Sequence, residues 1–176
     1  YAIDTIQNYL AFAFVGLMIG SIIAATKSRD FIETGFIPMG MIGVSICMFL
    51  VPFFVNPIAL VILYSLTGLF GGLFLVPVNA LLQYNTRPNN SGSVLALANM
   101  IQAIVLIAFL FLFSLMVHYT NIRPQLYFLG IAIVSLVVFV WTISNLPQAL
   151  LRMLLKLVFN RYRIRVLGVQ NIPNEG

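Results

Sequence analysis

The stretch VLALANMIQAIVLIAFLFLFSLMV at residues 94–117 contains no charged side chain. A helix needs about 20 residues to cross the roughly 30 Å of hydrocarbon in a bilayer, so this stretch is long enough to span a membrane. Four further apolar stretches of similar length occupy residues 9–26, 36–55, 58–82 and 126–146. The sequence therefore predicts an all-α polytopic membrane protein with five transmembrane helices.

The composition of the chain agrees with this fold class. Hydrophobic residues make up 61% of the sequence and charged residues 7%, against about 25% charged residues in an ordinary globular domain. A soluble core cannot bury that much apolar surface. A cleavable signal peptide would explain one apolar stretch and leave four.

The basic residues predict the orientation of the chain. If the apolar stretches cross the membrane alternately, eight of the nine lysines and arginines lie on one side. That side carries Lys27, Arg29, Arg87, Arg152, Lys156, Arg161, Arg163 and Arg165, and the other side carries Arg123. The positive-inside rule makes the first side cytoplasmic, with residue 1 outside. The net charge of +5 follows from this asymmetry, and we expect no nucleic-acid partner.

Catalytic and metal-binding chemistry has little support in the sequence. The chain contains one Cys, one His and four acidic residues. Cys47 lies inside an apolar stretch, and His118 lies at the end of another. We expect no catalytic residue, no metal site and no cofactor in this chain.

Small residues follow one face of two predicted helices. Gly16 and Gly20 form a GxxxG pair in the first stretch, and Gly68 and Gly72 form another in the third. Such faces let two helix backbones approach closely. The pattern predicts either dimerisation or close packing inside one bundle.

Pro77, deep in the third stretch, predicts a kink because its ring frees a backbone carbonyl.

Uncharged amides are the polar side chains that distinguish two of the predicted helices. Asn79 and Gln83 lie four residues apart in the third stretch, and Asn99 and Gln102 lie three apart in the fourth. None of the five stretches contains Asp, Glu, Lys or Arg, which argues against a proton relay or a voltage sensor. The amides either hydrogen-bond between helices or line a path for a polar lipid headgroup.

The pattern changes after residue 146. In residues 147–160, Arg152 and Lys156 lie among leucines, which predicts a juxtamembrane amphipathic helix whose basic side chains contact anionic lipid headgroups. In residues 161–176, arginines first alternate with apolar residues, which predicts the first strand of a soluble domain. The chain is thus divided into residues 1–146, 147–160 and 161–176.

Three segments carry a resemblance to a known family. They read GLMIGSIIA at 16–24, IETGFIPMG at 32–40, and GGLFLVPVNALLQ at 71–83 followed by GSVLALAN at 92–99. With them, residues 1–146 resemble the C-terminal half of a major facilitator superfamily transporter of the lysophospholipid transporter branch. The resemblance implies that the five stretches are helices eight to twelve of a twelve-helix fold in the bacterial inner membrane.

The tail is similar to a second family. YRIRVLGVQNIPNEG at 162–176 resembles the opening strand of glycerolipid acyltransferases of the 1-acyl-glycerol-3-phosphate type. In these enzymes a GxxNIP segment precedes the catalytic HxxxxD motif, which this sequence does not contain. Since the chain begins with Tyr1 and has an odd number of predicted spans, we expect it to be a segment of a longer polypeptide. The missing parts would be the N-terminal half of the transporter and a downstream acyltransferase domain.

Together these resemblances imply transmembrane transport. The expected substrate is a lysophospholipid, delivered to a fused enzyme that reacylates it, and the expected partners are membrane lipids and the missing domains. Two alternatives remain open: spans that merely anchor an acyltransferase, and a facilitator of another small solute. An anchor needs neither glycine faces nor paired amides, so these features favour transport.

Overall fold

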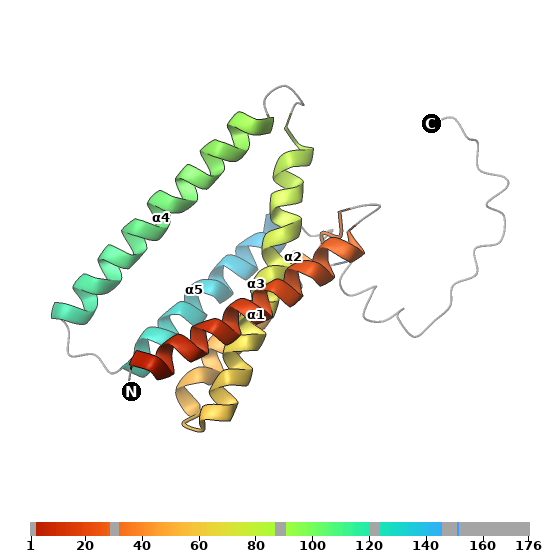
Figure 1. Ribbon diagram of the computed structural model, residues 1–176. Helices are drawn as coiled ribbons and strands as arrows, with labels where there is room; N and C mark the ends of the chain where they lie inside the picture. The colour runs from red at the N-terminus through yellow and green to blue at the C-terminus, as the bar shows by residue number, and fades with distance from the viewer. Residues whose placement is uncertain (1–2, 29–31, 87–90, 120–123, 146–150, 152–176) are drawn as a thin grey trace, which may run out of the picture.

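The computed structural model describes residues 3–28, 32–86, 91–119, 124–145 and 151, and this part of the chain is all-α. Its helices, in order (Figure 1), are α1 (Ile3–Lys27), α2 (Phe36–Leu50), the 3₁₀ helix η1 (Val51–Phe53), α3 (Pro57–Tyr84), α4 (Ser91–Tyr119) and α5 (Pro124–Asn145). Five segments are long and apolar enough to cross a membrane: Gln7–Lys27, Phe36–Phe53, Pro57–Tyr84, Ser91–Tyr119 and Gln125–Ser144. The five helices predicted from the sequence are therefore present, as expected for a multi-pass membrane protein.

The predictions for the tail fall on another part of the chain. The amphipathic helix at 147–160, with Arg152 and Lys156, lies outside the described residues apart from Leu151. The strand at 161–176 lies outside them altogether. Both stay predictions.

The helix ends differ from the predicted ends for local reasons. The second helix was expected at 36–55, but α2 stops at Leu50 and continues as the tighter η1. Pro52 lacks the N–H that another α-helical turn needs. At the start of α3, Pro57 takes the first position and the Asn56 side chain accepts a hydrogen bond from the Ile58 N–H at 2.9 Å, as is typical of an N-cap.

α1 also differs from its prediction, in the opposite direction. It begins at Ile3, six residues before the predicted apolar stretch at 9–26. The intervening sequence, IDTIQN, is mostly polar but contains no Gly or Pro. Nothing in it interrupts a helix, so the hydrophobic run underestimates the length of α1.

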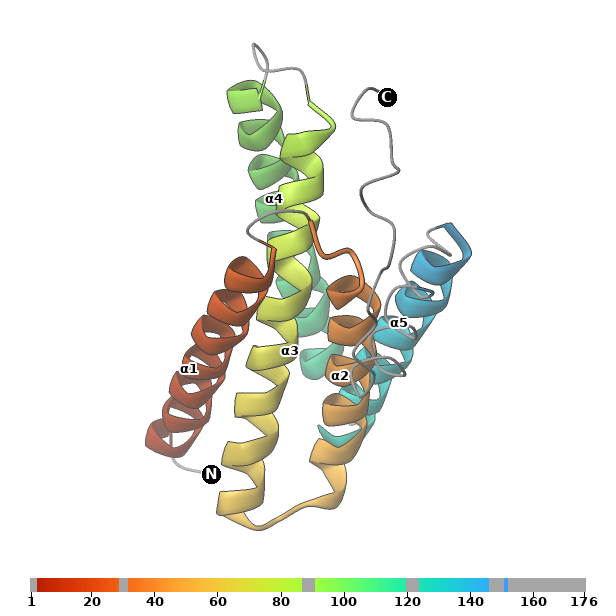
Figure 2. The ribbon, with the colours of Figure 1, turned by 90° about the vertical axis from the view of Figure 1, so that its right-hand side faces the viewer.

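Four of the helices form a row with α3 near its centre. Figure 2 shows α1 on one side of α3 and α2 on the other, with α5 beyond α2, and the extensive helix contacts are α1 with α3, α2 with α3, and α2 with α5. α1 and α3 run in the same direction, whereas α2 runs against both of its neighbours. Near the start of α3, Tyr9 stacks on Tyr64 with ring centroids 5.6 Å apart, which fastens α1 to α3.

α4 stands apart from this row. In Figure 1 α4 lies apart from α1, α2 and most of α3, and none of its described residues is buried. α4 contacts α3 weakly. The C-terminal end of α4 contacts α5, where the Tyr127 hydroxyl hydrogen-bonds to the Met116 carbonyl. The chain thus combines a packed four-helix row with one largely exposed span.

Candidate functional site

The four predicted packing glycines all lie between α1 and α3. Each faces the backbone of the other helix, so a methyl group added to it would overlap a carbonyl oxygen: that of Ser65 for Gly16, Leu69 for Gly20, Ala13 for Gly68 and Leu17 for Gly72. The contacts are reciprocal, since each helix presents its small residues to the other. Both helices belong to the same chain, so these faces pack the bundle internally.

A second glycine face, on α2, was not singled out from the sequence. A Cβ on Gly40 would lie 2.6 Å from the Phe70 carbonyl oxygen, and one on Gly43 would overlap the Phe70 ring. The Phe70 ring, on α3, therefore fills the space that the missing side chain of Gly43 leaves open. The three-residue spacing of Gly40 and Gly43 is the sequence signal that points to this face.

Hydroxyl groups join α2 to α5. The Ser45 side chain is buried and contacts the Ser135 hydroxyl of α5, and it also hydrogen-bonds to the Met41 carbonyl at 2.9 Å. A polar contact of this kind between helices contributes about 0.6–2 kcal/mol in a membrane. The Ser45–Ser135 contact therefore helps to hold α2 and α5 together.

Pro77 lies inside α3 and is fully buried. The helix continues on both sides of it, to Tyr84. Its ring removes the hydrogen bond that the Leu73 carbonyl would otherwise accept within the helix. The predicted kink at this position stays a prediction.

The predicted pathway amides occupy one end of α3 and α4. Asn79 is half-buried, whereas Gln83, Asn99 and Gln102 are exposed. All four lie in the halves of α3 and α4 nearest residues 85–90. Among the described residues, no hydrogen bond joins one amide pair to the other. The structure thus places the pairs at the same end of two consecutive spans, with no hydrogen bond between the pairs among the described residues.

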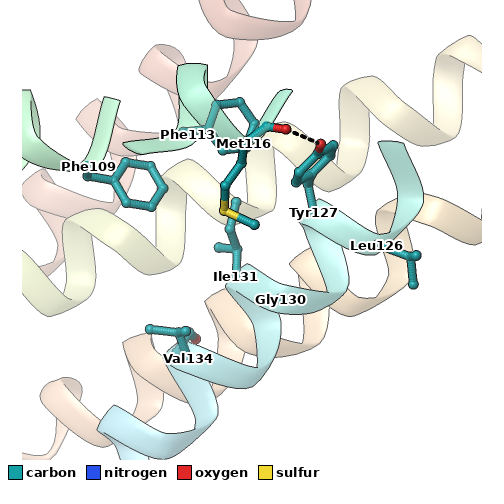
Figure 3. A pocket seen from close by; sticks show the side chains of 9 residues that line it. Phe109, Phe113, Met116, Leu126, Tyr127, Gly130, Ile131 and Val134 are labelled. Atoms are coloured by element: carbon teal, nitrogen blue, oxygen red, sulfur yellow. Dashed lines mark hydrogen bonds between the residues drawn. The ribbon is translucent and has the colours of Figure 1, made fainter. Parts of the chain in front are cut away.

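At the other end of α4, a cleft separates it from α5. The cavity has a volume of about 330 Å³ and is lined by Phe109, Phe113, Met116, Leu126, Tyr127, Gly130, Ile131, Val134 and Ser135. Figure 3 shows the Met116 side chain reaching from α4 toward Ile131 of α5. The walls are almost entirely hydrocarbon and aromatic, and none of the lining side chains is charged. The cleft can therefore accept an apolar group.

The two helices contact each other at one end of the cleft. The Tyr127 hydroxyl donates a hydrogen bond to the Met116 carbonyl oxygen at 3.5 Å (Figure 3). The Tyr127 ring also meets the Phe113 ring edge-on, with centroids 5.2 Å apart. Sequence reasoning missed this site, although Phe109, Phe113 and Met116 recur at helical spacing and Gly130 interrupts the opposite wall.

No known protein family, curated protein or solved structure matches the chain. Within the described residues, no three His, Cys, Asp or Glu side chains are placed to hold a metal ion. The function of the chain is therefore inferred from its residue patterns and from the geometry of the described helices.

Proposed function

We propose that this chain is part of a transporter that moves lysophospholipid across the membrane, as do the transporters of the major facilitator superfamily branch that it resembles. The observation that carries the proposal is the exposure of Asn99 and Gln102 on α4, a span that is otherwise strongly apolar. The position of the two amides within that span decides what they can contact.

The depth of these amides follows from the length of α4. The helix has 29 residues and is about 43 Å long at 1.5 Å per residue, longer than the roughly 30 Å of hydrocarbon. With α4 centred in the bilayer, Asn99 and Gln102 lie roughly 5 and 10 Å inside the hydrocarbon boundary. An amide that has no hydrogen-bond partner there costs roughly 2–7 kcal/mol. A polar path or a polar ligand beside α4 removes that cost.

The exposed side chains of α4 favour a lysophospholipid over a small polar solute as the substrate. A lysophospholipid has a polar headgroup and one acyl chain, so it needs uncharged polar groups beside an apolar wall. α4 offers both, since its amides lie toward one end and apolar side chains such as Phe109 and Leu112 are exposed farther along. Amides can hydrogen-bond a zwitterionic headgroup without leaving an uncompensated charge in the membrane.

Two further features support this substrate. The tail resembles an acyltransferase, whose reaction consumes a lysophospholipid. Exposed amides inside a span cost free energy in hydrocarbon, and a simple anchor has no need of them.

The test is lysophospholipid uptake by the full-length protein, measured with alanine variants of the amides. We expect Asn79→Ala, Gln83→Ala, Asn99→Ala and Gln102→Ala each to reduce the uptake rate while expression is unchanged. The expected loss is about tenfold for one hydrogen bond worth roughly 1.4 kcal/mol. Ile101→Ala is the matched control, because Ile101 is exposed on α4 between two of the amides.

The alternatives give different results. Equal losses of uptake and expression would assign the amides to helix packing. Full uptake in all four variants would remove them from the path. A wild-type protein that takes up no lysophospholipid but still supports reacylation would indicate an anchor.

A further inference from the structure

We propose that the cleft between α4 and α5 binds the acyl chain of a lysophospholipid while the headgroup lies at the membrane surface. This inference rests on the proposed function and adds a second subsite to it, at the end of α4 opposite the amides. It is carried by the depth, the volume and the lining of the cleft.

The depth of the cleft fits within one leaflet of a bilayer. On α4 the lining runs from Met116 back to Phe109, and on α5 from Leu126 to Ser135. These stretches of helix are about 10 and 14 Å long, slightly less than half of the roughly 30 Å hydrocarbon thickness. With α4 centred in the bilayer, the cleft runs from the membrane surface toward the midplane, and it can cover most of the length of a single acyl chain.

The volume of the cleft favours one chain over two. Ligand cavities have volumes of about 300–1,000 Å³, and this cavity lies near the lower limit. Gly130 contributes to the space, because a Cβ built on it would meet no other atom within 4 Å. The opposite wall includes Met116, whose flexible thioether adapts to chains of different shape.

The surface end of the cleft is suited to an amphiphile. The Tyr127 side chain links α5 to α4 there through its bond to the Met116 carbonyl oxygen. Tyrosine side chains are favoured at the level of lipid headgroups, where the ring contacts hydrocarbon and the hydroxyl contacts polar groups. An acyl chain in the cleft would therefore have its headgroup near Tyr127 and the end of α4.

The first experiment fills the cleft with a larger side chain at Gly130, where an added Cβ would meet no other atom within 4 Å. Gly130→Leu places a side chain in the cavity, and Gly92→Leu is the matched control, since Gly92 lies on α4 outside the cleft and its Cβ would also meet nothing within 4 Å. In the full-length protein we expect Gly130→Leu to raise the KM for lysophospholipid uptake at least tenfold. Gly92→Leu should change it less than twofold.

The second experiment locates the chain directly and does not depend on a variant. A lysophospholipid that carries a photoactivatable diazirine on its acyl chain is irradiated with the wild-type protein, and the labelled peptides are identified by mass spectrometry. We expect label in the segments 109–116 and 126–135. A diacyl phospholipid that carries the same diazirine should label these segments much less, because the cleft has room for one chain.

The outcomes separate this inference from the proposed function. Wild-type uptake with unlabelled cleft segments, or with equal labelling by the diacyl lipid, overturns the cleft assignment and leaves transport standing. Selective labelling without uptake by the wild type overturns transport and retains a site for single-chain lipids. An unchanged KM for a folded Gly130→Leu variant also overturns the inference.

Discussion

Two adjacent glycines of α3 allow a test of the α1–α3 contact. A Cβ on Gly72 would lie 2.5 Å from the Leu17 carbonyl oxygen and 2.6 Å from the Ser21 amide nitrogen. A Cβ on Gly71 would have the Leu17 Cδ1 atom as its nearest neighbour, at 3.6 Å, which is an ordinary van der Waals distance. The same change, glycine to alanine, therefore meets backbone at one position and a flexible side chain at the next.

The expected magnitudes follow from these distances. To reach 3.0 Å, below which Cβ contacts are essentially never seen, the backbones around Gly72 must separate by 0.5 Å (3.0 − 2.5). Overpacking of this kind costs about 1–3 kcal/mol. Replacing glycine by alanine inside a helix stabilises by about 1 kcal/mol at either position, so this gain cancels between the two variants. The free energy of unfolding of Gly71→Ala should therefore exceed that of Gly72→Ala by about 1–3 kcal/mol, roughly 5- to 150-fold in the folding equilibrium.

The assay is equilibrium unfolding of the purified full-length protein in mixed micelles with increasing SDS, followed by helix content. We expect Gly71→Ala to unfold at the same SDS fraction as the wild type or at a higher one. Gly72→Ala should unfold at a lower SDS fraction than Gly71→Ala. If the two variants unfold together, the α1–α3 backbones are not in close contact, and the packing described for this pair is wrong.

Two further predictions concern the membrane orientation and the tail. A reporter fused after Gly176 should be active in the cytoplasm and one inserted after Asn121 outside it, as the positive-inside rule requires, and the reverse pattern would overturn the orientation. A peptide of residues 148–160 should bind vesicles that contain anionic lipid and be released as salt screens Arg152 and Lys156, whereas binding that is insensitive to salt and lipid charge would argue against an interfacial helix.

The number and order of the helices could be predicted from the sequence because the signal is strong. A charge-free run of about 20 residues has few stable alternatives to a membrane-spanning helix. The exact ends depend on smaller energies. Pro52 ended α2 earlier than the hydrophobic run, while the polar residues before Tyr9 extended α1.

The partners of each helix face could not be predicted in the same way. A GxxxG pair indicates that a backbone approaches closely, but it does not identify the helix that approaches. The pairing of Gly16 with Ser65, and of Gly43 with the Phe70 ring, depends on how the helices are arranged in space. The cleft beside Gly130 was missed for the same reason, since its two walls come from different helices.

The amides are an intermediate case. Their presence inside apolar stretches was evident from the sequence, and the structure adds that Asn99 and Gln102 are exposed on α4. Exposure alone does not identify what contacts them in the membrane. Their assignment to a substrate path therefore stays with the proposed function.

Movement of a lysophospholipid between leaflets tests the central proposal most directly. The full-length protein is reconstituted into vesicles with a headgroup-labelled fluorescent lysophospholipid, and a membrane-impermeant quencher reports the fraction of lipid in the outer leaflet over time. We predict that protein-containing vesicles redistribute the lysophospholipid faster than protein-free vesicles, and that they leave a diacyl phospholipid with the same label in place. Equal rates with and without protein would contradict transport of lysophospholipid by this protein.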